Sequence, residues 1–490
     1  MTVLNRIKYY LMHFIFLLIL ISYTLPCIAR NNTLAFKNIY PVSVDSYGAI
    51  GDGIHDDSVA IQEAFDNNTY VSFTAGKTYK LISNGLCIRN DLVIEGNNSS
   101  ILIDDSYSPQ KTDFNKHIIR HAYNSKSNYL NISNLNIDIQ IKRNTYSGNN
   151  GMNYLCIFQP TYINNICLEN VNITVCQSEN KIINLWLDHG CDSFIMKNST
   201  LENFTTYKEG GVLWFMSSED KLFNEYTDYK NIEIYNCTFE GICGDEIVSI
   251  YGSYSANALF EDCNIIGNNQ SPNTTRPLTI YSNGHNTYYD VIFNNCNMTC
   301  MYNTSIKNCS YDSFIGVGSN TSNNYFNINF TNCSINASIK NCLLYPNLIQ
   351  KNITNIHTYN INNPNIEINF SSCNIISDKP IAGSCSQFIS ETRDLIALGF
   401  NMKNCNIICN NSLAILTPIW TNNNFYYYTP TINLEDNHIY ICNPTALLVS
   451  KYSNLDAILN INNNHIGKEI YGSSYINQST ISYLTQPYSE

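Results

Sequence analysis

The nine residues 231–239, NIEIYNCTF, contain the pattern that decides the fold. Ile232 and Ile234 alternate as side chains on one face of a β-strand do, and Cys237 begins a second alternating stretch. The step from 234 to 237 breaks the period of two, so a corner must separate two strands. Asn236 occupies this corner, and asparagine tolerates the left-handed backbone conformation that other residues resist.

The same strand, corner and strand recur along the chain. Alignment on the corner residue gives eleven positions, spaced 26 to 40 residues apart: Asn134, Asn170, Asn198, Asn236, Asp262, Asn295, Asn332, Ser372, Asn404, Asp436 and Asn463. A repeat of this length with variable spacing is typical of stacked coils whose insertions lie in loops. A propeller would need four antiparallel strands in each blade at steadier spacing. The sequence therefore predicts an all-β fold, a single parallel β-helix of about eleven or more coils.

Six coils carry a cysteine directly after the corner. They are Cys237, Cys263, Cys296, Cys333, Cys373 and Cys405. Cysteines in an oxidising compartment normally form disulfides. Their identical place in the repeat instead favours an inward ladder of small apolar thiols, with pairing between neighbouring coils as the alternative.

The composition supports a large core and excludes one class of partner. Hydrophobic residues make up 44% of the chain and charged residues 13%. The net charge is −12 with 27 Lys and Arg, so no broad basic face is expected to neutralise phosphates. We therefore expect no nucleic-acid partner. Asparagine accounts for about 77 of the 490 residues, which fits a chain with many corners.

The N-terminus predicts secretion. Arg6 and Lys8 precede the apolar run LMHFIFLLILIS, and Cys27-Ile28-Ala29 is a small-residue cleavage site, as in a secretory signal peptide spanning residues 1–29. The run is shorter than the roughly 20 residues of a membrane span. The alternatives are an N-terminal membrane anchor that is not cleaved and a lipid anchor attached to Cys27. We expect a secreted, extracellular or cell-surface protein without a membrane span in the mature chain.

Residues 43–105 contain an ordered set of glycines, acidic residues and apolar residues. They are Asp45, Tyr47, Gly48, Ala49, Gly51, Asp52, Gly53, Asp56, Asp57, Ala60, Ile61, Gln62, Ala75, Gly76 and Tyr79. With this set, the segment resembles the opening of the pectate-lyase-like superfamily of right-handed parallel β-helices, which includes rhamnogalacturonase-like, epimerase-like and polygalacturonase-type members. The resemblance implies a short N-terminal helix that caps the open end of a right-handed coil stack. It predicts a cap with the first coils at 30–105, further coils at 106–470, and a C-terminal tail or cap at 471–490.

The capping segment also contains a cluster that looks like a metal or acid site. It comprises Asp52, His55, Asp56 and Asp57. Because Asp56 or Asp57 can cap the expected helix, we interpret the cluster as structural. The apolar stripe of that helix is expected to contain Ser58, Val59, Ile61, Ala64 and Phe65.

Residues 241–253, GICGDEIVSIYGS, are similar to the G-D-D-C-V-A-I coil of polygalacturonase-type glycosidases. The similarity implies that Asp245 and Glu246 act as general acid and as activator of water, with a third carboxylate from Glu209 or Asp188. The sequence departs from that pattern in three places. Glu246 replaces an Asp, Gly210 stands where a third Asp is expected, and Arg276 stands where a His is expected.

The alternation of side chains along the strand predicts which way Asp245 and Glu246 point. If Val248 and Ile250 point inward, strict alternation also points Glu246 inward and Asp245 outward. A buried Glu246 would need a partner.

Further candidates for binding a sugar lie on nearby coils. Arg276 can hold a carboxylate with two hydrogen bonds, and Trp214 and Tyr288 can stack on sugar rings. His189 and His285 are the remaining candidates for substrate contact.

The sequence therefore predicts a secreted polysaccharide-active protein. The leading hypothesis is a glycoside hydrolase acting on a pectic or other acidic polysaccharide, with no cofactor and no metal. The alternative is a non-catalytic β-helix that binds glycans, such as an adhesin or a spike, for which a trimer is a possible oligomer. A polysaccharide lyase is the lesser alternative, and such an enzyme can use Ca²⁺.

Overall fold

The computed structural model describes residues 40–110, 117–122, 125–142, 155–178, 180–205, 210–217, 228–242, 246–269, 276–284, 286–302, 313–319, 324–337, 342–348, 366–377, 398–409, 413–416, 431–441, 447–449, 458–468 and 474–476. The chain divides into the units Met1–Pro41 and Val42–Glu490, and the second unit is the subject below. The predicted signal peptide, residues 1–29, lies outside the described residues. Within the described part of the chain, no helix is both long and apolar enough to cross a membrane.

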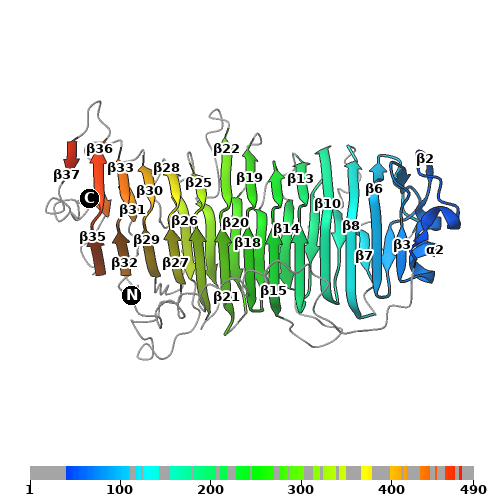
Figure 1. Cartoon of the computed structure of the whole chain (residues 1–490), viewed down its shortest axis with the longest axis horizontal. Helices are drawn as coiled ribbons and strands as arrows, with labels where there is room; N and C mark the ends of the chain where they lie inside the picture. Colours follow the sequence, from blue (N-terminus) through cyan, green and yellow to red (C-terminus); the bar gives the residue numbers. More distant parts are fainter. Residues whose placement is uncertain are drawn as a thin grey trace, which may run out of the picture. The chain divides into compact units, whose positions relative to one another are not determined.

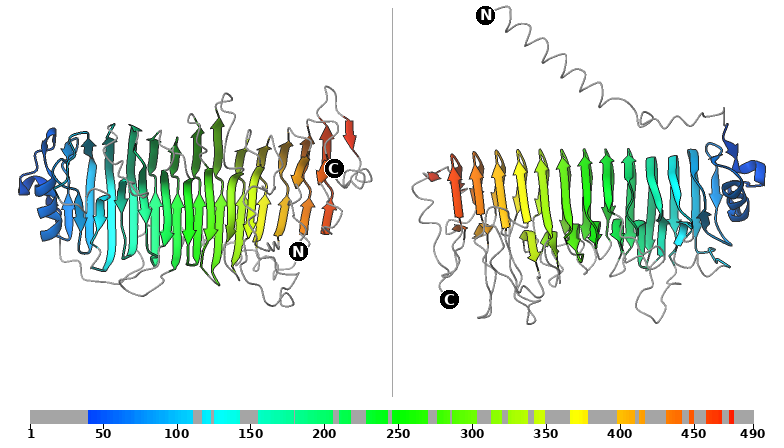
Figure 2. Two further views of the ribbon diagram at one scale, coloured as in Figure 1. Left: turned by 180° about the vertical axis from the view of Figure 1, so that it is seen from behind. Right: turned by 90° about the horizontal axis from the view of Figure 1, so that it is seen from below.

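The second unit is a stack of parallel coils, and the coils in the middle of the stack have three strands each (Figures 1 and 2). We call the face before each corner the entry face and the face after it the exit face. A separate nine-stranded sheet forms the third face. Parallel crossovers of this kind wind right-handed, so the predicted right-handed parallel β-helix is confirmed.

The strands of the three faces pair in parallel register from coil to coil. The entry face contains β12 (Ser193–Lys197), β15 (Tyr229–Tyr235), β18 (Ala256–Glu261), β21 (Tyr288–Asn294), β24 (Tyr325–Thr331), β27 (Ile366–Ser371), β29 (Leu398–Lys403), β32 (Thr431–Glu435) and β35 (Ile458–Asn462). The exit face contains β13 (Thr200–Thr205), β16 (Thr238–Gly241), β19 (Asn264–Asn269), β22 (Asn297–Tyr302), β25 (Ser334–Ala337), β28 (Asn374–Ser377), β30 (Asn406–Cys409), β33 (His438–Ile441) and β36 (His465–Lys468). The nine-stranded sheet contains β5 (Leu86–Ile88), β7 (His117–His121), β9 (Leu155–Gln159), β11 (Ile182–Leu187), β14 (Gly211–Ser217), β17 (Glu246–Gly252), β20 (Arg276–Ser282), β23 (Ser313–Ser319) and β26 (Cys342–Leu348).

The first and last coils differ from those between them. The long strands β6 (Leu92–Asp104), β8 (Ser127–Gln140) and β10 (Ile163–Ser178) run through the corner and belong to both the entry and the exit face. Near the other end, β31 (Leu413–Leu416) and β34 (Leu447–Val449) form a separate two-stranded sheet. Within the predicted tail, β37 (Ser474–Ile476) pairs antiparallel with β36 and so ends the parallel order.

Each corner predicted from the repeat is a left-handed residue. All eleven positions have φ between 49° and 56°. The asparagine side chains also connect neighbouring coils: Asn170 Nδ2 donates to Asn134 Oδ1 at 2.8 Å, and Asn236 Nδ2 donates to Asn198 Oδ1 at 2.9 Å. The corner asparagines thus supply both the bend and a coil-to-coil hydrogen bond.

The core is filled by stacked side chains at equivalent places in successive coils. Phe260, Phe293, Phe330 and Phe370 form one stack with ring centroids 4.8 to 5.0 Å apart. The six aligned cysteines form a second, buried stack and are free thiols in the structure. Each of these thiols donates to the backbone oxygen two residues earlier, as Cys296 does to Asn294 at 3.3 Å. The expected inward ladder of thiols is therefore present.

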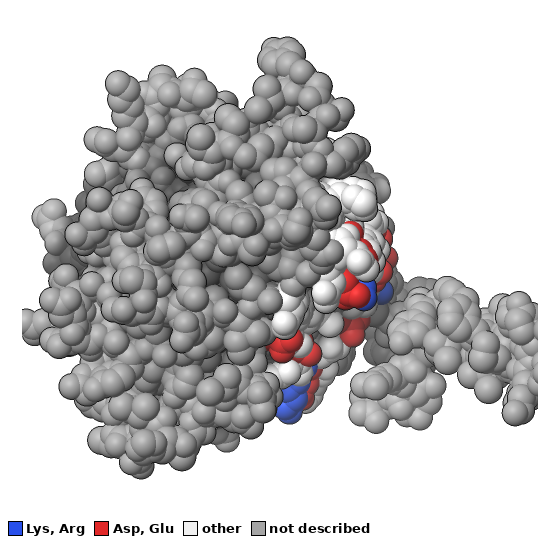
Figure 3. All heavy atoms as spheres, turned by 90° about the vertical axis from the view of Figure 1, so that its left-hand side faces the viewer, with Lys and Arg blue, Asp and Glu red and all other residues white. Residues whose placement is uncertain are grey.

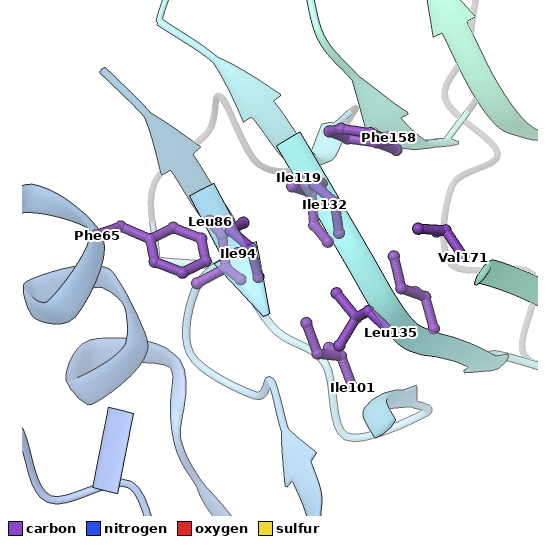
Figure 4. Close-up of a pocket in the computed structure, with 10 residues that line it drawn as sticks. Phe65, Leu86, Ile94, Ile101, Ile119, Ile132, Leu135, Phe158 and Val171 are labelled. Carbon is purple, nitrogen blue, oxygen red and sulfur yellow. The ribbon is translucent and has the colours of Figure 1, made fainter. Parts of the chain in front are cut away.

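The N-terminal cap contains a short helix, as predicted. It begins with β1 (Val42–Ser43), the 3₁₀ turn η1 (Val44–Tyr47) and β2 (Asp52–Asp56), followed by α2 (Ser58–Asn67), β3 (Tyr70–Ser72) and β4 (Thr78–Lys80). The helix buries Ser58, Ile61, Ala64 and Phe65. Val59 is 56% exposed, so its predicted place in the apolar stripe is wrong. Beneath the helix, Phe65, Leu86, Ile94 and Ile101 help to line a small apolar cavity (Figure 4).

The acidic cluster of the cap is bound to backbone groups. Asp57 Oδ1 accepts from Ile50 N at 2.6 Å, and its Oδ2 accepts from Gly51 N and Lys80 N, both at 3.2 Å. Asp56 accepts from the backbone of Ile82 at 3.0 Å. Asp57 stands at the N-cap position but makes no side-chain capping bond to the helix. The other predicted candidate, Asp56, accepts from the backbone N–H of Ser58, the first helical residue, at 3.1 Å. The Asp57 carboxylate instead holds β4 and the turn before β2 together.

A buried histidine in β7 makes stability depend on pH. His121 is fully buried, its Nε2 lies 2.8 Å from Ser127 Oγ, and burial lowers its pKa to about 4. The unfolded chain takes up this proton below about pH 6.5, whereas the folded chain does so only near pH 4. The unfolded state therefore binds more protons in this window, and the free energy of unfolding should fall by about 3 kcal/mol as pH drops from 6.5 to 4.

Denaturant unfolding at several pH values tests this expectation. His121→Gln removes the titrating group, so its stability should change less than that of the original chain between pH 6.5 and 4. If the free energy of unfolding falls equally with pH in the two proteins, His121 is not the source of the pH dependence.

Candidate functional site

The structure describes six of the nine residues that the sequence marks as a site. Asp245, Glu209 and His285 lie outside the described residues. The other six are Asp188, His189, Trp214, Glu246, Arg276 and Tyr288. They fall into two groups on different parts of the coils.

The first group lies where strands of the nine-stranded sheet begin. Glu246 and Arg276 are the first residues of β17 and β20 and are register partners. Glu246 lies on the outer side, because Ile247 and Val248 are both buried in the core and interrupt the alternation. The prediction from strict alternation that Glu246 points inward is therefore wrong.

A threonine connects the two charged side chains. Thr279 Oγ1 accepts from Arg276 Nη1 at 3.1 Å and donates to Glu246 Oε1 at 3.3 Å. Arg276 Nη1 lies 3.6 Å from Glu246 Oε1, and the two side chains are 18% and 21% exposed. The guanidinium lies over Gly316, where an added Cβ would be 2.9 Å from Nη1. A side chain at position 316 would therefore displace the guanidinium from this place.

The side chain of Trp214 reaches the same end of these strands. Its register partner is Ser249, and its neighbours Leu213 and Phe215 belong to the core, so the indole lies on the outer side. The indole Nε1 donates to the backbone oxygen of Glu246 at 3.2 Å. The ring covers Gly211, where a Cβ would come within 1.9 Å of Nε1. At 8% exposure, Trp214 offers little ring surface to a sugar.

The chemistry of this first group is that of a recessed ion pair. Glu246 accepts from Thr279 and faces the positive charge of Arg276. Both contacts are made with groups of the protein itself, so Glu246 fits a role in positioning Arg276.

Asp188 and His189 follow the last residue of β11, at the opposite end of the strands from Glu246. Asp188 follows Leu187, the register partner of Phe215, and so stands about five residues beyond the level of Glu246. Five residues of a strand span about 16 Å, beyond the roughly 9.5 Å that separates the carboxyl groups of a glycosidase pair. Asp188 and Glu246 thus do not converge.

His189 is packed within the protein. Its ring lies 4.1 Å from that of Tyr162, centroid to centroid, and the residue is 9% exposed. The histidine that the sequence predicts to contact substrate is therefore largely covered, with one ring face packed against Tyr162.

Tyr288 is the most exposed of the six. It opens β21 on the entry face and is 47% exposed. Its register partner on the next coil is Tyr325, which is 44% exposed. Two tyrosines therefore stand side by side, one coil apart, on an open sheet face.

Polar groups border the tyrosine pair. Asn327 Nδ2 donates to Asp290 Oδ1 at 2.9 Å, and Glu367 is the register partner of Asn327. Partial burial raises the pKa of the Tyr288 hydroxyl, and the negative charges of Asp290 and Glu367 raise it further. These carboxylates therefore lie close enough to act on the tyrosine.

A row of amides continues from this point along the entry face. It consists of Asn329, Asn369, Asn401, Asn433 and Asn460, each donating to the one before it at 2.5 to 2.9 Å. An amide carries two N–H groups and an oxygen with two lone pairs, so the row keeps hydrogen-bonding capacity toward solvent. We call Tyr288, Asp290, Tyr325, Asn327 and Glu367, together with this row, the tyrosine-amide strip.

Sequence reasoning did not single out Tyr325, Thr279 or Gly316. Tyr288 and Tyr325 each stand seven residues before a corner, Asn295 and Asn332. Comparing offsets from the corners would therefore have found Tyr325. For metals, no three His, Cys, Asp or Glu side chains come together in a suitable group within the residues that the structure describes.

Comparison with known proteins gives likenesses in structure only. No family model matches the chain. No curated protein matches it either. The surface adhesin PfbA of Streptococcus pneumoniae is 13% identical with a TM-score of 0.36, over 85% of this chain and 93% of the adhesin. The tailspike protein gp49 of Pseudomonas phage LKA1 is 9% identical with a TM-score of 0.46, over 86% of this chain and 81% of the tailspike.

A third similar structure is the A-module of the mannuronan C-5 epimerase AlgE6 of Azotobacter vinelandii. It is 13% identical with a TM-score of 0.34, over 86% of this chain and 99% of the module. The parallel β-helix of this chain is established by its own strand pairing.

Proposed function

We propose that this protein is an extracellular polysaccharide-binding β-helix and that the glycan lies along the tyrosine-amide strip. The observation that carries the proposal is the pair of exposed tyrosines, Tyr288 and Tyr325, in register on one open face. Aromatic faces stack on sugar rings, and amide and carboxylate groups bond sugar hydroxyls. The repeat of about 4.8 Å between coils presents these groups at regular intervals to a polymer.

The recessed ion pair supports binding over catalysis. Glu246 and Arg276 are only 21% and 18% exposed and contact each other, whereas Tyr288 and Tyr325 are more than twice as exposed. A polymer can approach the strip without any rearrangement of the described side chains.

The test is binding to an array of bacterial, plant and animal glycans, with the affinity for each bound glycan then measured in solution. Tyr288→Ala and Tyr325→Ala should each weaken binding about tenfold, because each removes one stacking surface. Tyr440→Ala is the matched control, since Tyr440 is 40% exposed but lies on the exit face. If Tyr440→Ala weakens glycan binding as much as the strip variants do, the strip is not the binding surface.

Hydrolysis of the glycan is a second candidate function. It is favoured by Asp245, which is next in sequence to Glu246, the register partner of Arg276. A glycosidase needs a second carboxyl group within about 5 to 9.5 Å. Glu209 would have to supply it, because Asp188 lies at the opposite end of the strands. Release of reducing ends by the original chain, and its loss in Asp245→Asn, would support this candidate.

A lyase activity, with or without Ca²⁺, is the weakest candidate. Arginine is in general a poor base, and the guanidinium of Arg276 is engaged by Thr279 and Glu246. Absorbance from unsaturated products in the same assay distinguishes a lyase from a hydrolase.

A further inference from the structure

The charge around the exposed tyrosines differs from what an acidic glycan needs. The four entry-face strands β18, β21, β24 and β27 contain Glu261, Asp290 and Glu367 and no Lys or Arg. Asp290 and Glu367 accept from the amides of Asn327 and Asn401, at 2.9 and 3.3 Å, rather than from a cation. This part of the face is therefore negatively charged.

Other carboxylates on the entry face have basic partners. Toward the C-terminal coils, acidic and basic side chains lie side by side (Figure 3), and Lys403 Nζ lies 2.9 Å from Glu435 Oε2. On an earlier coil, Lys230 Nζ lies 2.6 Å from Asp192 Oδ1. No ion pair recorded among the described residues involves Asp290 or Glu367, so their charge remains uncompensated beside the tyrosines.

We infer that the tyrosine-amide strip selects glycans without acidic groups, that is, neutral or amine-bearing polysaccharides, and rejects uronates and sulfated sugars. The inference rests on the proposed function and narrows its ligand class. A neutral sugar can donate hydroxyl hydrogens to Asp290 and Glu367 in charge-assisted hydrogen bonds. A sugar carboxylate at the same place has no hydrogen to donate and meets two like charges.

The size of the discrimination follows from the distances. Two like charges about 4 Å apart in water-exposed surroundings repel enough to change affinity roughly fivefold, and more where solvent is partly excluded. With Asp290 and Glu367 both in place, a uronate polymer should bind at least about tenfold more weakly than its neutral counterpart. Salt screens such repulsion, so the difference should shrink at high ionic strength.

A matched pair of ligands tests the inference on the full chain. A uronate polymer from the array, such as polygalacturonic acid, is compared with its carboxyl-reduced form, in which each carboxylate has become a hydroxymethyl group. Array glycans whose binding depends on Tyr288 are ranked by charge in the same experiment. We expect the Tyr288-dependent ligands to be neutral or amine-bearing, and carboxyl reduction to strengthen binding about tenfold or more.

The double variant Asp290→Asn, Glu367→Gln should reduce this discrimination to less than about threefold while the tyrosine dependence persists. Glu169→Gln, an exposed carboxylate on a distant coil of the entry face, is the matched control and should leave discrimination unchanged. Tyr288-dependent binding that favours uronates would overturn the inference and leave the proposed function standing. An array without any Tyr288-dependent ligand would overturn both.

Discussion

Asp57→Ala should lower the free energy of unfolding by about 3 to 5 kcal/mol, one of the two largest effects expected from a single substitution in this chain. Asp57 is 1% exposed and accepts from three backbone N–H groups, those of Ile50, Gly51 and Lys80. Alanine removes the acceptor for all three. A buried N–H left without a partner costs about 1 to 3 kcal/mol, and the N–H of Gly51 is buried.

The loss should be concentrated in the cap. Hydrogen exchange of the amides between residues 42 and 104 should speed up, while amides of the middle coils keep their protection, because a stacked-coil protein is stabilised by contacts between neighbouring coils. Equilibrium denaturation gives the free energy. Glu63→Ala, an exposed position on the same helix, is the control and should change stability by less than about 0.5 kcal/mol.

Asp57→Asn separates the structural role from metal binding. The amide retains one oxygen that can accept, so it should lose less stability than alanine. If the acidic cluster instead held a metal, the asparagine variant would lose nearly as much, and a chelator would destabilise the original chain by a similar amount. Insensitivity to chelator is the expected result.

The fold could be predicted because its signal is repeated. One corner such as Asn236 is weak evidence, but eleven aligned corners, all with a positive φ in the structure, fix the order of the coils that contain them. Alternation around each corner also placed Cys237 and its equivalents inside. Both rules are local, since each depends on the backbone conformation of a few consecutive residues.

The candidate site could not be predicted in the same way because it departs from these local rules. Ile247 and Val248 are consecutive and both buried, so strict alternation gave Glu246 the wrong side. The distance between Asp188 and Glu246 depends on where each stands within its strand, which a coil count does not give. The strip needs register between coils: Tyr288 pairs with Tyr325 only because both stand seven residues before their corners.

Phe330→Ala should cost about 3 to 5 kcal/mol, the range for truncating a large side chain in a close-packed core. Phe330 is fully buried between Phe293 and Phe370, with ring centroids 5.0 and 4.8 Å away and nearly parallel rings. The neighbours on both sides are fixed by coil pairing, at about the spacing of strands in a sheet. They cannot move together to fill the space, so the cavity should persist.

Phe330→Leu is the informative control, because leucine keeps most of the apolar volume and loses only the ring contacts. It should cost about 1 to 1.5 kcal/mol, so that the two variants together separate the cavity from the aromatic stacking. Denaturant unfolding of both proteins gives the two free energies. Similar losses in the alanine and leucine variants would mean that the coils do collapse around the missing ring, and that strand pairing does not hold the stack apart. The strip offers a second measurement, because Tyr325 lies on the same strand as Phe330: a rigid stack predicts that Phe330→Leu leaves glycan affinity unchanged, since the register of β24 is set by its backbone pairing with β21 and β27.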